Sequence, residues 1–85
     1  MKVEIANDLH FEMDEKALND WRLIELLDDL DSNPAVMVRI AKMLLTPESY
    51  DKLKALNTDD DGHINAEKVQ EMLTDIMLAG QTAKK

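Results

Sequence analysis

The most apolar stretch of the chain is residues 35–45, where nine of eleven positions are hydrophobic and only Arg39 and Lys42 are charged. On a helical wheel these two residues leave only a narrow polar edge. A helix that lies against one core normally shows an apolar stripe and a polar back. The pattern therefore predicts a helix that is either almost completely enclosed by the rest of the chain or partly kept for a partner.

Two amphipathic segments flank this stretch and predict helices with recognisable starts. Residues 15–31 follow a predicted N-cap, Asp14, and residues 47–56 follow Thr46, with Pro47 at the first helical position. The first of these helices places its large apolar side chains on one broad arc: Trp21, Leu23, Ile24, Leu26, Leu27 and Leu30.

A last helix is predicted over residues 66–79. Its apolar residues recur at i, i+3, i+4, i+7 and i+8 after the N-cap Asn65. Gly80 is expected to end the helix, and residues 81–85 are expected to form a flexible C-terminal tail. A polar break, residues 57–62, separates this helix from the preceding one.

The N-terminus alternates apolar and polar residues, which predicts a β-hairpin over residues 2–5 and 9–13. Because a lone hairpin is marginally stable in water, its apolar face should pack on helices. That face carries Val3, Ile5, Phe11 and Met13. The expected fold is mostly α, a small four-helix domain over residues 1–80 with this short hairpin, about 2–13.

Composition and charge narrow the class of protein. Eighty-five residues suit one domain, and the absence of cysteine excludes disulfides and thiolate chemistry. No apolar run is long enough to span a bilayer, and the N-terminus lacks the apolar core of a signal peptide. The net charge of −8 disfavours nucleic acid and anionic membrane as partners, and suits plain solubility or a basic partner.

Residues 57–68 are similar to the calcium loop of an EF-hand. With Gly62 at the sharp turn, Asp59 and Asp61 fall on the third and fifth ligand positions. Asn57 replaces the opening aspartate, and Lys68 occupies the place of the closing carboxylate. The same residues fit an Asp-Gly turn that leads into an N-cap. We expect no metal or cofactor, and keep Asp59 and Asp61 as the alternative metal ligands.

The chain shows no catalytic constellation. His10 lies on a predicted strand and His63 in a loop, and both are expected to be exposed to solvent. The chain has only two glycines, too few for a glycine-rich phosphate loop, and neither Ser32 nor Ser49 lies in a nucleophile-elbow context. The chain is therefore expected not to be an enzyme.

A series of short segments carries a resemblance to a known family. They are Phe11-Glu12-Met13-Asp14, Leu18-Asn19-Asp20-Trp21, Leu23-Ile24-Glu25-Leu26-Leu27 and Asp31-Ser32-Asn33-Pro34, then Leu44-Leu45, Tyr50, Leu53, Leu56 and Asp61-Gly62-His63-Ile64. In this order and spacing, over about residues 9 to 79, the chain resembles the phage tail assembly chaperones of long-tailed bacteriophages and prophages. Thr46-Pro47 departs from the glycine-led turn expected at that place.

The resemblance implies a small, mostly helical protein of the bacterial host cytoplasm that is absent from the mature virion. It implies that the chain binds the tape measure protein, keeps its hydrophobic helices soluble and helps to recruit the tail tube protein. The family offers no catalytic residues to carry over. A homo-oligomer is compatible with this function.

The methionines on helices 35–45 and 66–79 suggest where the client of such a chaperone, the tape measure protein, binds. Methionine is flexible and suits surfaces that accept varied apolar partners, although it also fills gaps in small cores. We hypothesise that a groove between these helices binds an amphipathic client helix through Met37, Ile40, Met43, Leu44, Met72 and Ile76. The alternatives are an EF-hand-like calcium-binding module and an acidic protein-interaction domain unrelated to tail assembly, such as a nucleic acid mimic.

Overall fold

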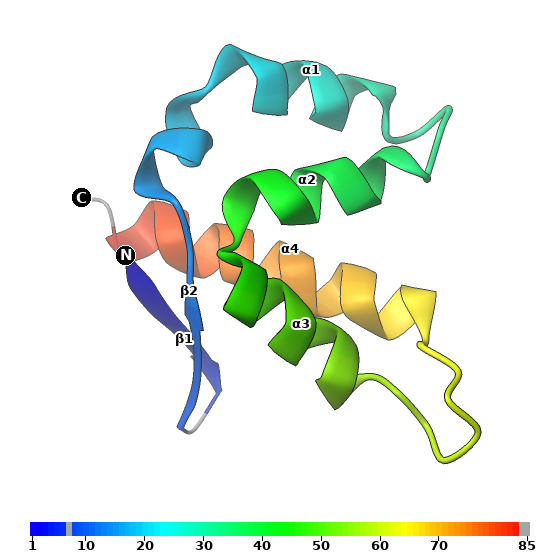
Figure 1. Cartoon of the computed structure of the whole chain (residues 1–85). Helices are drawn as coiled ribbons and strands as arrows, with labels where there is room; N and C mark the ends of the chain where they lie inside the picture. Colours follow the sequence, from blue (N-terminus) through cyan, green and yellow to red (C-terminus); the bar gives the residue numbers. More distant parts are fainter. Residues whose placement is uncertain (7, 84–85) are drawn as a thin grey trace.

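The computed structural model describes residues 1–6 and 8–83. Its elements are β1 (Lys2–Ala6), β2 (Leu9–Glu12), the 3-10 helix η1 (Glu15–Asn19), α1 (Trp21–Asp29), α2 (Val36–Leu44), α3 (Pro47–Leu56) and α4 (Ala66–Ala83). The prediction of a small, mostly helical fold with four α-helices and an N-terminal hairpin is confirmed (Figure 1).

The hairpin is antiparallel, with Val3 of β1 opposite Phe11 of β2. Both side chains are buried, and β1 packs on α4. The register shifts between Glu4 and Ala6, and Ile5 is only half-buried. Because two strands alone are marginal, this packing on a helix is what stabilises the hairpin.

Backbone hydrogen bonds join the end of the hairpin to the connection between α2 and α3. The N–H of Asp14 donates to the carbonyl of Leu44 at 2.7 Å, and the N–H of Thr46 donates to the carbonyl of Glu12 at 3.3 Å. The buried Ser49 hydroxyl accepts from the N–H of Glu12 at 2.7 Å. The hairpin is thus attached both to α4, through β1, and to the start of α3, through β2.

The prediction of a single helix over residues 15–31 is wrong, because the chain breaks at Asp20 into η1 and α1. Asp20 has an extended backbone, with φ −98° and ψ 127°. The Asp20 carboxylate accepts from the N–H of Arg22 at 2.9 Å and so caps α1. A short acidic side chain that can bond to nearby N–H groups favours a cap over a helix interior.

The broad apolar arc of this segment is not all core. Leu23 is buried and Leu26 and Leu30 are half-buried, whereas Trp21, Ile24 and Leu27 are 70%, 49% and 37% exposed. The helix packs chiefly on α2, so one edge of its arc is left open to solvent.

The predicted end of the last helix at Gly80 is also wrong. Helix α4 continues to Ala83, so Gln81 belongs to the helix and not to a flexible tail; residues 84 and 85 lie outside the described residues. Gly80 is buried, and a Cβ there would lie 2.6 Å from the Met13 Sδ and 3.2 Å from the Leu18 Cδ1. The glycine permits close approach of these side chains to α4 and does not act as a cap.

Helix α2 is only partly enclosed by the rest of the chain, so the alternative of almost complete enclosure for residues 35–45 is wrong. Its buried residues are Val36, Ile40, Ala41 and Leu44, while Met37 and Met43 are half-buried and Val38 is 48% exposed. Helix α3 spans the predicted residues, and Thr46 caps it by accepting from the N–H of Ser49. Over the described residues, no helix is both long enough and apolar enough to cross a bilayer.

Candidate functional site

A hollow of about 180 Å³ lies between α1, α2 and α4, and we call it the apolar groove. Its lining residues are Leu27 and Leu30 at the end of α1, Met37 and Ile40 of α2, and Leu73, Thr74, Met77, Leu78 and Gln81 of α4. None of these side chains is charged. In Figure 1, α1 lies over α2, and α4 passes behind α2. The groove is therefore a surface on which three helices present apolar side chains to solvent.

Exposure increases from the floor of the groove to its rims. Ile40 and Leu73 form the floor and are 1% and 0% exposed, whereas the rim residues Leu27 and Leu78 are 37% and 58% exposed. The walls between them carry the half-buried Met37 and Met77. Methionine side chains can adjust their shape to a ligand, which suits a groove that binds apolar segments.

The α1 rim continues beyond the groove. Trp21 and Ile24 precede Leu27 at three-residue spacing, so the three exposed side chains follow each other along one side of the helix. An exposed tryptophan is a common anchor of protein interfaces. Exposed apolar residues gathered on one side of a small protein are typical of an interaction surface.

Half of the residues predicted to bind a partner are not accessible to one. Ile40, Leu44 and Ile76 are 1%, 0% and 0% exposed. They lie on the helix faces that turn toward the core, and this corrects the hypothesis that the six predicted residues form one surface. Ile40 contributes only the floor of the groove.

The remaining three predicted residues are half-buried and lie in different places. Met37 lines the apolar groove. Met43 lines a depression with Leu26 and charged residues of α1 and α2. Met72 lies near Asn57, whose side-chain amide donates to its sulfur at 3.1 Å. Of the predicted set, only Met37 and Ile40 belong to the groove.

The predicted site omits Leu27, Met77 and Leu78, although the structure places them in the groove. A signal for Leu78 exists in the sequence, because it lies outside the apolar stripe of its own helix and is therefore expected to face solvent. The signal for Leu27 is weaker: it is one of six apolar residues on an arc too wide for a single neighbouring helix to cover.

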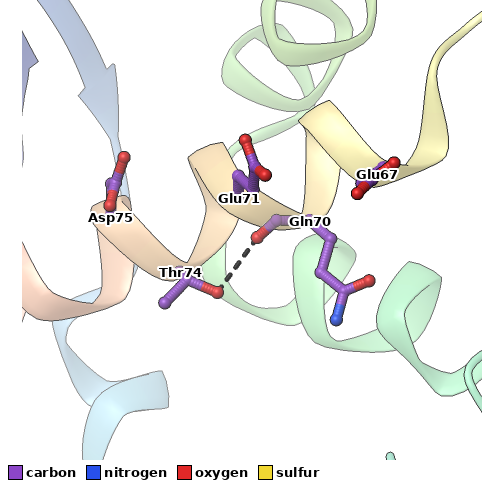
Figure 2. Close-up of a pocket in the computed structure, with 5 residues that line it drawn as sticks. All are labelled: Glu67, Gln70, Glu71, Thr74 and Asp75. Carbon is purple, nitrogen blue, oxygen red and sulfur yellow. Dashed lines mark hydrogen bonds between the residues drawn. The ribbon is translucent and has the colours of Figure 1, made fainter.

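An acidic row on α4 borders the groove. Glu67, Glu71 and Asp75 line a shallow depression with Gln70 and Thr74, and Thr74 also lines the apolar groove. In Figure 2 the three carboxylates project from successive turns of the helix. The Thr74 hydroxyl donates to the Gln70 carbonyl at 3.0 Å, as the dashed line in Figure 2 marks.

The Asp59 carboxylate accepts two backbone hydrogen bonds within its own loop. Its Oδ1 accepts from the N–H of Asp61 at 2.9 Å and from the N–H of His63 at 3.0 Å, which is the pattern of a side-chain-capped turn. Gly62 completes this turn with φ +84°. Within residues 1–6 and 8–83, no group of three or more His, Cys, Asp or Glu side chains is placed to hold a metal ion.

The shortest ion pair among the described residues is that of Asp20 with Arg22. The guanidinium Nη2 lies 2.7 Å from Asp20 Oδ2, and Nε lies 3.1 Å from Oδ1. These side-chain hydrogen bonds, together with that from the Arg22 N–H, lower the pKa of Asp20 to about 2. The side-chain hydrogen bonds and the charge of Asp20 raise the pKa of Arg22. Both groups therefore stay ionised at neutral pH, and the pair stabilises the start of α1.

The two histidines do not form a site with each other. His63 is exposed, as expected, whereas His10 is half-buried with its Nε2 3.7 Å from a carboxylate oxygen of Glu4.

Comparison with known proteins identifies no relative: no family model, no curated protein and no solved structure matches the chain.

Proposed function

We propose that the chain is a phage tail assembly chaperone that binds a helical segment of the tape measure protein in the apolar groove. The observation that carries this proposal is an uncharged groove between helices whose rims, Leu27 and Leu78, are exposed in the isolated chain. Proteins that bind amphipathic helices commonly use such grooves. The resemblance to the tail assembly chaperones supports the choice of the tape measure protein as the client.

The proposal explains why a small protein leaves leucines at the surface. Covering the exposed parts of Leu27, Leu78 and Ile24 with a client helix would contribute roughly 1 kcal/mol each, about half the value for a fully buried side chain. The client gains in the same way, because its apolar stripe is removed from water. In this view the chain acts in the host cytoplasm, and recruitment of the tail tube protein follows the loading of the tape measure protein.

The test is co-expression with the tape measure protein, which is expected to be encoded in a long, helix-rich reading frame immediately downstream. The double variant Leu27→Asp/Leu78→Asp should lose at least tenfold in affinity, because about 1.4 kcal/mol is enough for that change. The amount of soluble tape measure protein that co-purifies is the readout. Both residues are partly exposed, so the variant should keep the helical circular dichroism of the wild type.

The matched control is Leu56→Asp on α3, where the leucine is 51% exposed and does not line the groove. This variant should retain the client. Equal loss in the control and the groove variant, or no loss in either, would contradict the proposal. Sedimentation of the chain alone shows whether the groove instead joins two copies, in which case the groove variant becomes monomeric and the client binds elsewhere.

A further inference from the structure

We infer that the partner segment in the apolar groove is an amphipathic helix whose apolar stripe is flanked by lysine or arginine. This inference rests on the proposed function for the location of the site and adds the chemistry of the occupant. It is carried by the distribution of charge around the groove.

The α4 side of the groove is bordered by acids. Glu67, Glu71 and Asp75 are exposed and recur every four residues, so they form one row along the helix. Thr74 belongs to both the acidic depression and the groove, which makes the two surfaces continuous. Among the described residues, none of these three carboxylates forms an ion pair.

The α1 side is acidic as well. Asp28 follows Ile24 by one helical turn and is exposed. The exposed Asp31 lies just beyond the end of α1, next in the chain to Leu30 of the groove lining. The last turn of α1 contains no basic residue, so these acids add to the negative end of the helix dipole. Both rims of the groove therefore present negative potential.

The basic residues nearest the groove do not line it. Lys68 of α4 is exposed three residues before Glu71 and lines a separate depression with Asn57 and Asp59. Arg22 and Arg39 line the depression that contains Leu26 and Met43, and Arg22 is already paired with Asp20. Neither the groove nor the acidic depression has a lysine or arginine among its lining residues, all of which are described. An uncharged floor between two acidic rims complements a helix with an apolar stripe and basic flanks, and it repels one with acidic flanks.

The occupant is a helix rather than a strand because the groove lies between helices and has no strand edge that could pair with an extended chain. Helix α1 has nine residues and is therefore roughly 14 Å long, so about three turns of a partner would cover the rim. Helices of this length are marginal in isolation and become ordered when their apolar face is buried.

The test uses two synthetic peptides of about 18 residues, long enough to form a helix when bound. They share one leucine stripe and differ only in having lysine or glutamate beside it. Isothermal titration calorimetry with the full chain should show at least tenfold tighter binding of the lysine peptide. The variant Glu71→Lys/Asp75→Lys should weaken binding of the lysine peptide by at least tenfold and favour the glutamate peptide.

The matched control is Asp60→Lys/Asp61→Lys, which makes the same change in net charge in an exposed loop away from α1. It should leave the lysine peptide bound nearly as tightly as in the wild type. An equal loss in the control would mean unspecific attraction to an acidic protein and would overturn the inference. Binding of the lysine peptide that survives Leu27→Asp/Leu78→Asp would overturn it too, because the peptide would then lie outside the groove.

The charge inference and the proposed function fail in different ways. If both peptides bind equally but the groove variant still loses the tape measure protein, the sign of the flanks is wrong and the chaperone proposal stands. If the lysine peptide binds in the groove but the tape measure protein does not, the surface accepts basic helices of another protein.

Discussion

Short polar side chains decide where the helices of this protein begin. Asp14, Asp20 and Thr46 each accept a hydrogen bond from an N–H in the first turn that follows them. These N–H groups have no partner within the helix, so such a cap stabilises the first turn. Asp20 has the largest effect on the fold because its cap separates η1 from α1.

The Asp20–Arg22 pair predicts a pH dependence of stability. The pKa of Asp20 is lowered from 3.8 to about 2 in the folded chain, chiefly by the hydrogen bonds from Arg22. A lowered folded-state pKa stabilises the fold above the unfolded value, and this contribution is lost as the pH falls from about 4 to about 2. Asp20→Asn keeps a capping side chain but loses the charge. The wild type should be more stable than this variant at pH 7, and most of the difference should be lost near pH 2.

Urea unfolding at several pH values, with the carboxyl chemical shift of Asp20, measures both the stability and the titration. Asp60→Asn is the control, because Asp60 is exposed in the loop between α3 and α4 and forms no ion pair among the described residues. A difference between wild type and Asp20→Asn that stays constant from pH 7 to pH 2 would mean that the ion pair adds nothing to stability.

At the scale of elements, the contact of Gly80 with the N-terminal segment decides how closely α4 packs there. A Cβ at this position would lie 2.6 Å from the Met13 Sδ and 3.0 Å from its Cε. Gly80→Ala should therefore destabilise the chain by about 1 kcal/mol, because overpacking costs about 1–3 kcal/mol and exceeds the roughly 1 kcal/mol gained from helix propensity. Urea unfolding followed by circular dichroism measures this loss.

Met13→Ala provides the matching background for this test. It removes the nearer of the two side chains that the new Cβ would meet and leaves Leu18 Cδ1 at 3.2 Å, at a cost of about 2–5 kcal/mol by itself. In this background Gly80→Ala should become stabilising, which reverses its sign. A stabilising effect of Gly80→Ala in the wild-type background would show that Met13 moves aside freely and that the glycine is not needed for packing.

The elements that local signals encode are predictable from the sequence, and those that depend on packing are not. Helix α3 spans the predicted residues because Thr46 and Pro47 specify its start. The hairpin follows from the alternation of apolar and polar residues. The end of α4 differs from the prediction because a glycine is typical of a helix stop, whereas contact with Met13 explains Gly80 in the structure.

The candidate site is predictable only in outline. The sequence predicts a client groove beside the helix of residues 35–45, and Met37 and Ile40 do line a groove. Hydrophobic periodicity shows which residues share a helix face, and it does not show which neighbouring element covers that face. Leu44 and Ile76 are therefore core, and the exposed rims come from α1 and the C-terminal half of α4.

At the scale of the whole molecule, the acids dominate and their repulsion is largely uncompensated. The net charge is −8, and each ion pair of the described residues has at least one partner whose side chain is half or more exposed. Exposed ion pairs contribute little to stability in general. The row Glu67, Glu71 and Asp75 adds like-charge neighbours on α4, which destabilise a helix.

Salt should therefore change stability and client binding in opposite directions. Raising NaCl from about 0.01 M to about 0.15 M shortens the Debye length from roughly 30 Å to roughly 8 Å. Repulsion among the acids weakens, so the free energy of unfolding should rise by on the order of 0.5 kcal/mol, the cost of one to two like-charge pairs. Attraction between the groove rims and a basic helix weakens too, so affinity for the lysine peptide should fall.

The variant Glu71→Lys/Asp75→Lys distinguishes this explanation from a general effect of salt. It brings the net charge from −8 to −4, since each replacement adds two charges. Its stability should rise less with NaCl, because the ammonium group at position 71 attracts the Glu67 carboxylate that Glu71 repels, and because the lower net charge leaves less repulsion to screen. A wild-type stability that falls with added salt would mean that ion pairs outweigh repulsion, and the acidic rims would then be balanced within the protein rather than by a basic partner.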